Sequence, residues 1–348
     1  MDKVRLAMVG CGMMGQSVHL QSFLKNPKCE VVAICDQDGE LAAKVAKRYG
    51  IPASYSSIDA LIREAKFDAA AAIVLWPSNV TVAIPLLDAG KHVYLEKPMA
   101  NNAKEANAIA DAAERNKVRL MVAYMKRYDL GTELAKKLLT ESSADAAMGK
   151  IQYARFHNFG GDWTCQYNVP FIKAAKPTPR PPIWQGAPDF VKQEDRDFYA
   201  GDVGNMCHDV NLIRFMLGEP RKIRFVALKD KKPFWSRRVV MFDYGDFDCA
   251  WETGHTQTPF FDEGALIRFE KGWIRLALHA PLRIGAPADV EIYRNNRLER
   301  PQPGWVWSFQ READHFVECV LGNKESHSSG RDSAKDIALM EEIYRATL

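Results

Sequence analysis

Residues 4–15 carry the sequence VRLAMVGCGMMG. The run 4–9 is short and mostly apolar, which predicts a strand that ends at Gly10. A helical pattern follows from Met13, and Pro27 prevents its continuation. This stretch therefore predicts a strand, a glycine-rich turn and a helix in direct succession.

The three glycines of this turn are spaced as G-x-G-x-x-G, and each is expected to have a separate role. Gly10 allows the chain to turn off the strand, Gly12 lets the backbone approach a pyrophosphate, and Gly15 lets the helix pack close to the strand. The backbone N–H groups of Met13 and Met14 start the helix and then face the negative charge of the phosphates. The turn is therefore expected to bind a dinucleotide.

A second strand, predicted at residues 30–35, ends at Asp36, which lies 21 residues after Gly15. A carboxylate at this point is expected to accept hydrogen bonds from both hydroxyls of the adenosine ribose. Its charge repels a 2′-phosphate, which favours NAD over NADP. The alternative is that Asp36 is a solvated helix cap, because the next helix begins at residues 38–40.

The composition is that of a soluble globular chain with room for two domains. Of its 348 residues, 47% are hydrophobic and 26% are charged, and the formal net charge is only +3. No basic tract suggests a nucleic-acid partner, and no apolar run reaches membrane-spanning length. The seven cysteines are scattered without a C-x-x-C motif, and the first strand begins a few residues after Met1. We therefore expect reduced thiols, no signal peptide and a cytoplasmic location.

Strands and helices alternate through the first part of the chain, at the spacing of a parallel sheet covered on both faces. Further strands are predicted at 69–75, 92–95 and 120–124, and helices at 40–49, 58–65, 80–89 and 103–115. We therefore expect an α/β Rossmann domain with a doubly wound parallel sheet, which binds NAD, at residues 1–125. Ligands bind such sheets at the carboxyl ends of the strands, so the glycine turn, Asp36 and Glu96-Lys97-Pro98 are expected on one rim.

The pattern changes beyond about residue 129. A loop-rich stretch extends from 160 to 200, six short strands fall between residues 223 and 293, and helices are predicted at 130–139, 203–217, 309–321 and 333–346. Residues 126–348 are therefore expected to form an α+β domain with a large, mostly antiparallel, open-faced sheet, which serves substrate binding and oligomerisation. The bare face of this sheet is the surface on which a homodimer or homotetramer is expected to form.

Glu96-Lys97-Pro98 follows the strand 92–95, at the rim where the nicotinamide end of a dinucleotide is expected. A lysine there can hold a substrate hydroxyl and stabilise the developing alkoxide as a hydride leaves carbon. The alternative is a surface lysine paired with Glu96, and the tripeptide alone does not exclude it.

Several of these motifs together resemble the glucose–fructose oxidoreductase/inositol dehydrogenase/MocA family. They are the glycine turn, Asp36, the run GKHVYLEKP at 90–98 and the helix within 201–218, and the resemblance extends over nearly the whole chain. It implies that Lys97 lies beside the nicotinamide and is catalytic or substrate-binding, with Glu96 in the cofactor site. It also implies that the substrate is a sugar, a cyclitol or a related polyol.

The same family has an acid four residues before a histidine and another three residues after it. His208 matches this histidine, whereas Gly204 and Asn211 occupy the two acid positions. The resemblance implies that His208 is a general acid/base in an incomplete triad, and that Asn205 bonds a substrate hydroxyl. The ordinary pKa of histidine, about 6.5, suits this role, and a site near the start of a helix is expected to keep the imidazole neutral. The alternative is a buried histidine bonded to a backbone carbonyl.

Three further places supply candidate residues. Trp76, Pro77 and Asn79 occupy the loop that, by the same resemblance, packs against the nicotinamide ribose; the alternative is a plain turn with an asparagine cap. Arg127 is expected either to contact substrate or to tie the domains together. Trp163 is a candidate platform for a sugar ring, with a mobile lid and an oligomer contact as open alternatives. The eight histidines show no close pair at helical spacing, so no metal site is predicted.

We therefore expect an NAD-dependent dehydrogenase that oxidises a secondary alcohol of a sugar, a sugar derivative or a cyclitol. Lys97 would hold the reacting oxygen, and His208 would take its proton. One alternative returns the hydride after eliminating a glycosidic leaving group, which makes the chain a redox-neutral glycoside hydrolase. Another is a non-catalytic sensor that binds NAD and sugar, which the missing acids around His208 would fit.

Overall fold

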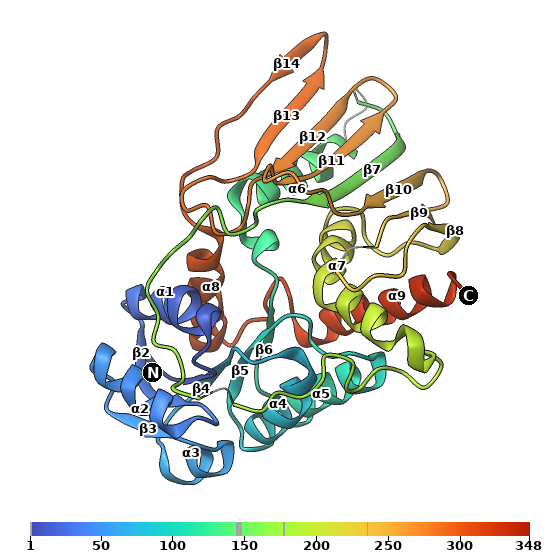
Figure 1. Cartoon of the computed structure of the whole chain (residues 1–348). Helices are drawn as coiled ribbons and strands as arrows, with labels where there is room; N and C mark the ends of the chain where they lie inside the picture. The colour runs from blue at the N-terminus through green and yellow to red at the C-terminus, as the bar shows by residue number, and fades with distance from the viewer. Residues whose placement is uncertain (1, 144–147, 177, 235) are drawn as a thin grey trace. The chain divides into compact units, whose positions relative to one another are not determined.

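A computed structural model describes residues 2–143, 148–176, 178–234 and 236–348, which divide into two compact units (Figure 1). The first unit contains the residues up to Tyr124 together with Asn168–Val191 and Phe309–Ala338. The second contains Met125–Tyr167, Lys192–Ser308 and Leu339–Leu348. The sequence predicts a single boundary near residue 125, whereas two later stretches of the chain pack with the first unit.

The first unit is built on a six-stranded sheet in the order β3-β2-β1-β4-β5-β6, and every pair of neighbours is parallel. This confirms the predicted doubly wound Rossmann sheet. The strands are β1 (Val4–Val9), β2 (Cys29–Cys35), β3 (Ala53–Tyr55), β4 (Ala69–Ala72), β5 (His92–Glu96) and β6 (Leu120–Ala123). The helical segments between them are η1 (Gly15–His19), α1 (Leu20–Lys25), α2 (Gly39–Tyr49), α3 (Ile58–Glu64), η2 (Trp76–Ser78), α4 (Asn79–Asp88) and α5 (Ala103–Arg115). The strand order reverses between β1 and β4, which is where ligands bind in such sheets.

Helix α8 (Ser308–Gly322) packs with the first unit through aromatic side chains. The ring of Tyr94 on β5 lies 5.3 Å from that of Phe23 on α1 and 5.6 Å from that of Phe316 on α8, centroid to centroid. All three rings are buried. Burial of large aromatic surfaces is a strong driving force for packing, and it explains why α8 groups with the N-terminal sheet.

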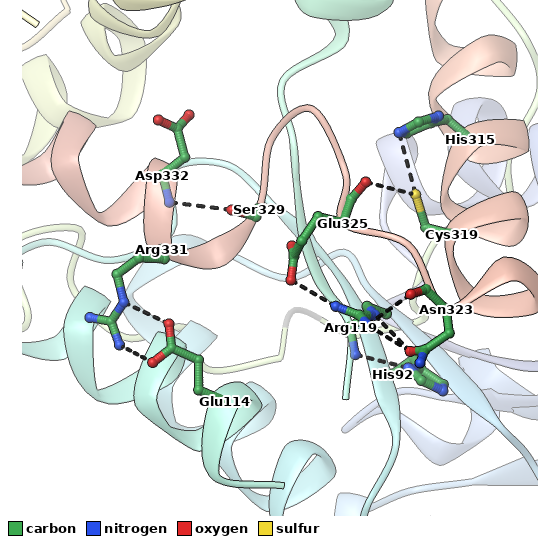
Figure 2. A network of polar contacts seen from close by, with 10 residues as sticks. All are labelled: His92, Glu114, Arg119, His315, Cys319, Asn323, Glu325, Ser329, Arg331 and Asp332. Carbon is green, nitrogen blue, oxygen red and sulfur yellow. Dashed lines mark hydrogen bonds and ion pairs between the residues drawn. The ribbon is translucent and has the colours of Figure 1, made fainter. Parts of the chain in front are cut away.

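Polar contacts hold the following segment and the start of α9 (Gly330–Arg345) to the same unit (Figure 2). Arg119, just before β6, donates to Asn323 Oδ1 at 2.7 Å and pairs with Glu325 at 2.8 Å. Arg331 binds both carboxylate oxygens of Glu114 on α5, at 2.8 and 2.7 Å. A bidentate pair of this kind fixes orientation as well as distance, so these contacts determine where the segment lies.

The second unit is built on an eight-stranded sheet in the order β14-β13-β12-β11-β7-β10-β9-β8. Its neighbours are antiparallel except for β7 and β10, which confirms the mostly antiparallel sheet that the sequence predicts. The strands are β7 (Ile151–Gly160), β8 (Lys222–Leu228), β9 (Arg238–Asp243), β10 (Asp248–Thr253), β11 (Asp262–Phe269), β12 (Trp273–Leu278), β13 (Asp289–Arg294) and β14 (Arg297–Glu299). The helical segments of this unit are η3 (Met125–Tyr128), α6 (Leu130–Ser143), η4 (Gln193–Asp195) and α7 (Arg196–Leu217).

The two faces of the second sheet differ in character. One face is buried, with Phe156 and Trp251 at most 2% exposed. The other face carries a hollow of about 390 Å³ lined by arginines 155, 268 and 275 together with His157 and Trp273. The expected homo-oligomer contact on this face remains a prediction. Within the described ranges, no helix has the length and apolar character needed to cross a membrane.

Candidate cofactor and substrate site

The parallel register brings the predicted cofactor residues to one edge of the first sheet. Val9 pairs with Cys35 on one side and with Ala72 on the other, and Ala72 pairs with Leu95. The glycine turn, Asp36, the segment leading to Trp76 and the Glu96-Lys97-Pro98 turn each follow one of these paired residues. They therefore leave the sheet at the same edge, as the sequence predicts.

The glycine turn has the shape that a dinucleotide requires. Gly10 has a φ of +92°, and a Cβ there would lie 2.1 Å from the carbonyl oxygen of Ile73. A Cβ on Gly15 would lie 2.3 Å from the carbonyl oxygen of Gly10, so the helix and the turn are in direct contact. A Cβ on Gly12 would meet no atom within 4 Å. Two glycines are thus required by the fold, whereas Gly12 leaves its backbone open for a phosphate to approach.

Asp36 binds the glycine turn directly. Its Oδ2 accepts a hydrogen bond from the backbone N–H of Cys11 at 2.7 Å, and its Oδ1 accepts from that of Asp38 at 3.0 Å. The cap of α2 is Asp38, whose carboxylate accepts from Leu41 N, so the alternative of Asp36 as the helix cap is wrong. Each carboxylate oxygen can accept a second bond, which leaves capacity for ribose hydroxyls.

The helix after the turn differs from the regular α-helix that the sequence predicts. Met13 and Met14 are helical and partly exposed, and the next residues, Gly15–His19, form a π-helix before α1 begins. Gln16 in this segment is buried, and its Nε2 donates to the carbonyl oxygen of Cys11 at 2.6 Å. Short π-helical segments occur frequently at functional sites.

Asn79 holds the turn that carries Lys97. Its side chain is fully buried, and its Nδ2 donates to the carbonyl oxygen of Glu96 at 3.0 Å and to that of Pro98 at 2.8 Å. Both of its amide hydrogens are therefore used on the backbone that flanks Lys97, whose side chain is partly exposed. No side-chain capping bond occurs at the start of α4, so the alternative of Asn79 as a helix cap is wrong. The geometry makes Asn79 a positioning residue for Lys97.

A chain of buried polar groups lies behind Glu96. The Glu96 carboxylate accepts from the backbone N–H of Lys97, and its other oxygen lies 3.6 Å from His19 Nε2. His19 Nδ1 lies 3.0 Å from the Tyr94 hydroxyl, which donates to Glu312 Oε2 at 2.6 Å. Burial raises the pKa of Glu312 well above its ordinary value, which favours the neutral acid. Hydrogen bonds thus connect α8 to His19, and a longer contact of 3.6 Å leads from His19 to the glutamate of the Lys97 turn.

Trp76 and Pro77 lie in η2, at the same edge of the sheet. Pro77 is buried, and the indole Nε1 of Trp76 donates to Asn101 Oδ1 at 2.9 Å. Trp76 is therefore fixed to the segment that follows the Lys97 turn. Its expected packing against a nicotinamide ribose remains a prediction.

His208 and Asn205 share one face of α7 in the second unit. Both side chains are partly exposed, whereas every other residue from 201 to 210 is buried. Residues three apart lie on the same side of a helix, so the two form one small polar surface. The sequence predicts this helix from residue 203, but α7 begins at Arg196, twelve residues before His208. The expectation that the helix start keeps His208 neutral is therefore wrong, because that effect fades within the first turn.

Arg127 is buried in the second unit. Only 4% of the residue is exposed, its Nε donates to Asn211 Oδ1 at 2.8 Å, and its guanidinium lies 5.3 Å from the ring centroid of Phe215. Asn211, at one of the acid positions of the family pattern, therefore anchors an arginine. These contacts favour a structural role for Arg127 over the expected contact with substrate.

A buried charged cluster next to His208 is absent from the predicted site residues. Lys126 forms an ion pair with Glu263 and lies 3.6 Å from Asp209 Oδ1, and all three residues are at most 8% exposed. Burial alone would lower the pKa of Lys126, but the two carboxylates raise it. Burial raises the pKa of Glu263 to about 7, although the charge of Lys126 opposes this shift. No local motif reveals the pair, because Lys126 and Glu263 lie 137 residues apart in the chain.

Trp163 is 43% exposed and lies in the second unit, and its carbonyl oxygen accepts from Leu282 N at 3.5 Å. The predicted residues thus fall into two sets. The first unit holds Gly10, Gly12, Met13, Met14, Gly15, Asp36, Trp76, Pro77, Asn79, Glu96 and Lys97, and the second holds Arg127, Trp163, Asn205 and His208. Across the described ranges, no three His, Cys, Asp or Glu side chains are grouped so that they could hold a metal ion.

Comparison with known proteins finds similarity to the first unit and, with other proteins, similarity over nearly the full length of the chain. Residues 4–124 match the Gfo/Idh/MocA family, described as an oxidoreductase family with an NAD-binding Rossmann fold. The D-apiose dehydrogenase of Paraburkholderia graminis is 22% identical over 97% of this chain and 86% of its own length. The inositol 2-dehydrogenase of Rhizobium meliloti is 21% identical over 99% of this chain and 96% of its own. The family match thus covers the N-terminal Rossmann region, and the two dehydrogenases are similar to the chain over nearly its full length.

The family match and these relatives confirm the resemblance seen in the sequence, and with it an NAD(P)-binding Rossmann unit and an oxidoreductase. A solved oxidoreductase from Agrobacterium radiobacter, in complex with NAD⁺, L-tartaric acid and magnesium, has the same fold. It superposes with a TM-score of 0.75 at 19% identity, over 99% of this chain and 96% of that one.

Proposed function

We propose that the chain oxidises a secondary alcohol of a sugar, a sugar derivative or a cyclitol, with NAD as the hydride acceptor. The observation that carries the proposal is the edge of the first sheet, where the open backbone at Gly12 follows β1 and the Lys97 turn follows β5, the two neighbours of β4. Two full-length relatives named as dehydrogenases of a sugar and a cyclitol support the substrate class. Asp36 at the adenosine position favours NAD over NADP.

Each candidate residue would have a separate role in the oxidation. Bound NAD would supply the carbon that accepts a hydride from the substrate C–H bond. Lys97 would hold the reacting oxygen and stabilise its negative charge, and His208 would accept the hydroxyl proton, so that a ketone is formed. Asn79 fixes the backbone on both sides of Lys97, and so fixes the point from which the lysine side chain extends.

The test compares Lys97→Ala with Lys104→Ala, a matched control on the exposed side of α5. Both are assayed with NAD and NADP against hexoses, uronates, inositols and glycosides, by absorbance of the reduced nicotinamide. We expect Lys97→Ala to lose turnover and to keep NAD affinity, while Lys104→Ala resembles the unmodified chain. Unchanged turnover in Lys97→Ala would remove this lysine from the mechanism. Release of aglycone without net NADH would replace net oxidation by the redox-neutral alternative.

A further inference from the structure

One segment between β7 and α7 packs with the first sheet. We call residues 168–176 and 178–191 the strap; they form no helix or strand and belong to the first unit (Figure 1). Four amide side chains, Gln16, Gln37, Asn101 and Asn102, donate hydrogen bonds to backbone carbonyls of the strap. A hydrogen bond to a backbone carbonyl does not depend on the side chain of the accepting residue. The strap is therefore held through its backbone.

The first part of the strap is bound beside the glycine turn and beside Asp36. Gln16, one residue after Gly15, binds both polar groups of Ile172: its Oε1 accepts from Ile172 N at 2.9 Å, and its Nε2 donates to Ile172 O at 2.8 Å. Gln37, one residue after Asp36, donates to Pro179 O at 3.4 Å.

The second part of the strap is bound beside the Lys97 turn. Asn101 donates to Ile183 O at 2.7 Å and to Gln185 O at 2.6 Å, while its Oδ1 accepts from Trp76. Asn102 donates to Gly186 O at 2.6 Å. The anchors thus follow strands β1, β2 and β5. Because β2 and β5 lie on opposite sides of β1 in the sheet, the strap is held both on the Asp36 side and on the Lys97 side of the glycine turn.

The strap leaves the backbone at Gly12 uncovered. A Cβ on Gly12 would meet no atom within 4 Å, although the strap is fixed at Gln16 close by. Lys173, Lys176 and Arg180 in the strap are exposed cations, which suits a ligand that carries a diphosphate. The strap therefore does not block the approach of a phosphate to the backbone at Gly12.

We propose that the strap is the outer wall of the dinucleotide site, and that the cofactor leaves only after the amide anchors release. This inference rests on the proposed function and adds the control of cofactor exchange to it. Because net oxidation exchanges NADH for NAD in every turnover, release of the anchors would then be a step of the catalytic cycle.

The test is the rate at which bound NADH leaves, followed by its fluorescence after mixing with excess NAD. The double variant Asn101→Asp/Asn102→Asp removes three donated bonds to the strap, but it keeps the oxygens that accept from Trp76 and cap α5. We expect release to be faster by about tenfold or more, because three of the hydrogen bonds that hold the strap are lost. Asn107→Asp is the matched control, since its amide donates within α5, to Ala103 O.

A second measurement uses the unmodified chain. Backbone hydrogen exchange of the strap is expected to slow when NADH is bound, because the cofactor then occupies the space beneath it. Equal release rates in the unmodified chain and both variants, with strap exchange unchanged by NADH, would overturn the proposal while leaving the dehydrogenase intact. Failure of the unmodified chain to bind either NADH or NADPH would instead overturn the proposed function as well.

Discussion

Alanine at each of two glycines should separate cofactor binding from folding. Gly12→Ala places a methyl group where no atom lies within 4 Å, and Gly12 does not have a positive φ. The change should therefore leave the free energy of unfolding equal or raise it by about 0.4–1 kcal/mol, since alanine restricts the unfolded chain. Gly15→Ala places the same methyl 2.3 Å from the carbonyl oxygen of Gly10. It should lower the free energy of unfolding by about 1–3 kcal/mol, as expected for overpacking.

The affinity for NAD should fall in Gly12→Ala, the variant whose stability is expected to be preserved. The methyl at position 12 would push the pyrophosphate away from the backbone N–H groups that face it. Loss of one hydrogen bond to a charged group costs about 1.5–3 kcal/mol, so the Kd for NAD should rise by about tenfold to a hundredfold in Gly12→Ala. The assays are calorimetric titration with NAD and chemical denaturation without it. Native NAD affinity in Gly12→Ala, or equal stability of the two variants, would refute this account of the glycine turn.

Two further predictions concern buried residues, one in each unit. Asn79→Ala removes the donor of two buried carbonyls beside Lys97, so kcat should fall by about tenfold or more with little change in NAD affinity; steady-state kinetics showing a loss of NAD affinity alone would contradict this. The raised pKa of Glu263, about 7 against an ordinary 4.5, means that the stability it contributes is present below pH 4.5 and is lost as pH rises through 7. Glu263→Gln mimics the neutral acid, so urea unfolding should show a smaller loss of stability between pH 5.5 and 8.5 than the unmodified chain, and parallel losses would count against it.

Local sequence patterns predict most of the first sheet. The spacing of the glycines and the stop at Pro27 are local features, and the alternation of strands with helices then fixes a parallel sheet. Because parallel strands end at one edge, Asp36 and Lys97 could be placed on that edge without coordinates. The strands Ala53–Tyr55 and Arg297–Glu299 were beyond this reasoning, because three residues carry no readable period.

Contacts between distant parts of the chain explain the rest. The segment 309–338 packs with the first sheet through pairs such as Arg119 with Glu325, and neither partner carries a signal that points to the other. The strap is held by side-chain amides that donate to its backbone carbonyls. Every residue has such a carbonyl, so the sequence of the strap does not reveal these contacts. Helix α7 begins seven residues before the predicted start, which changes the argument about His208. Long-range packing therefore decides what the sequence pattern leaves undetermined.

Transfer of a deuterium label tests the central claim most directly. The polyol found by the substrate screen is labelled at the carbon to be oxidised and mixed with NAD and the chain in a single turnover, and the nicotinamide is analysed by mass spectrometry. We predict that the unmodified chain moves the label to the nicotinamide, and that Lys97→Ala binds NAD equally well but moves almost none. Transfer at the native rate in Lys97→Ala, or a ketone formed without label on the nicotinamide, would contradict the account.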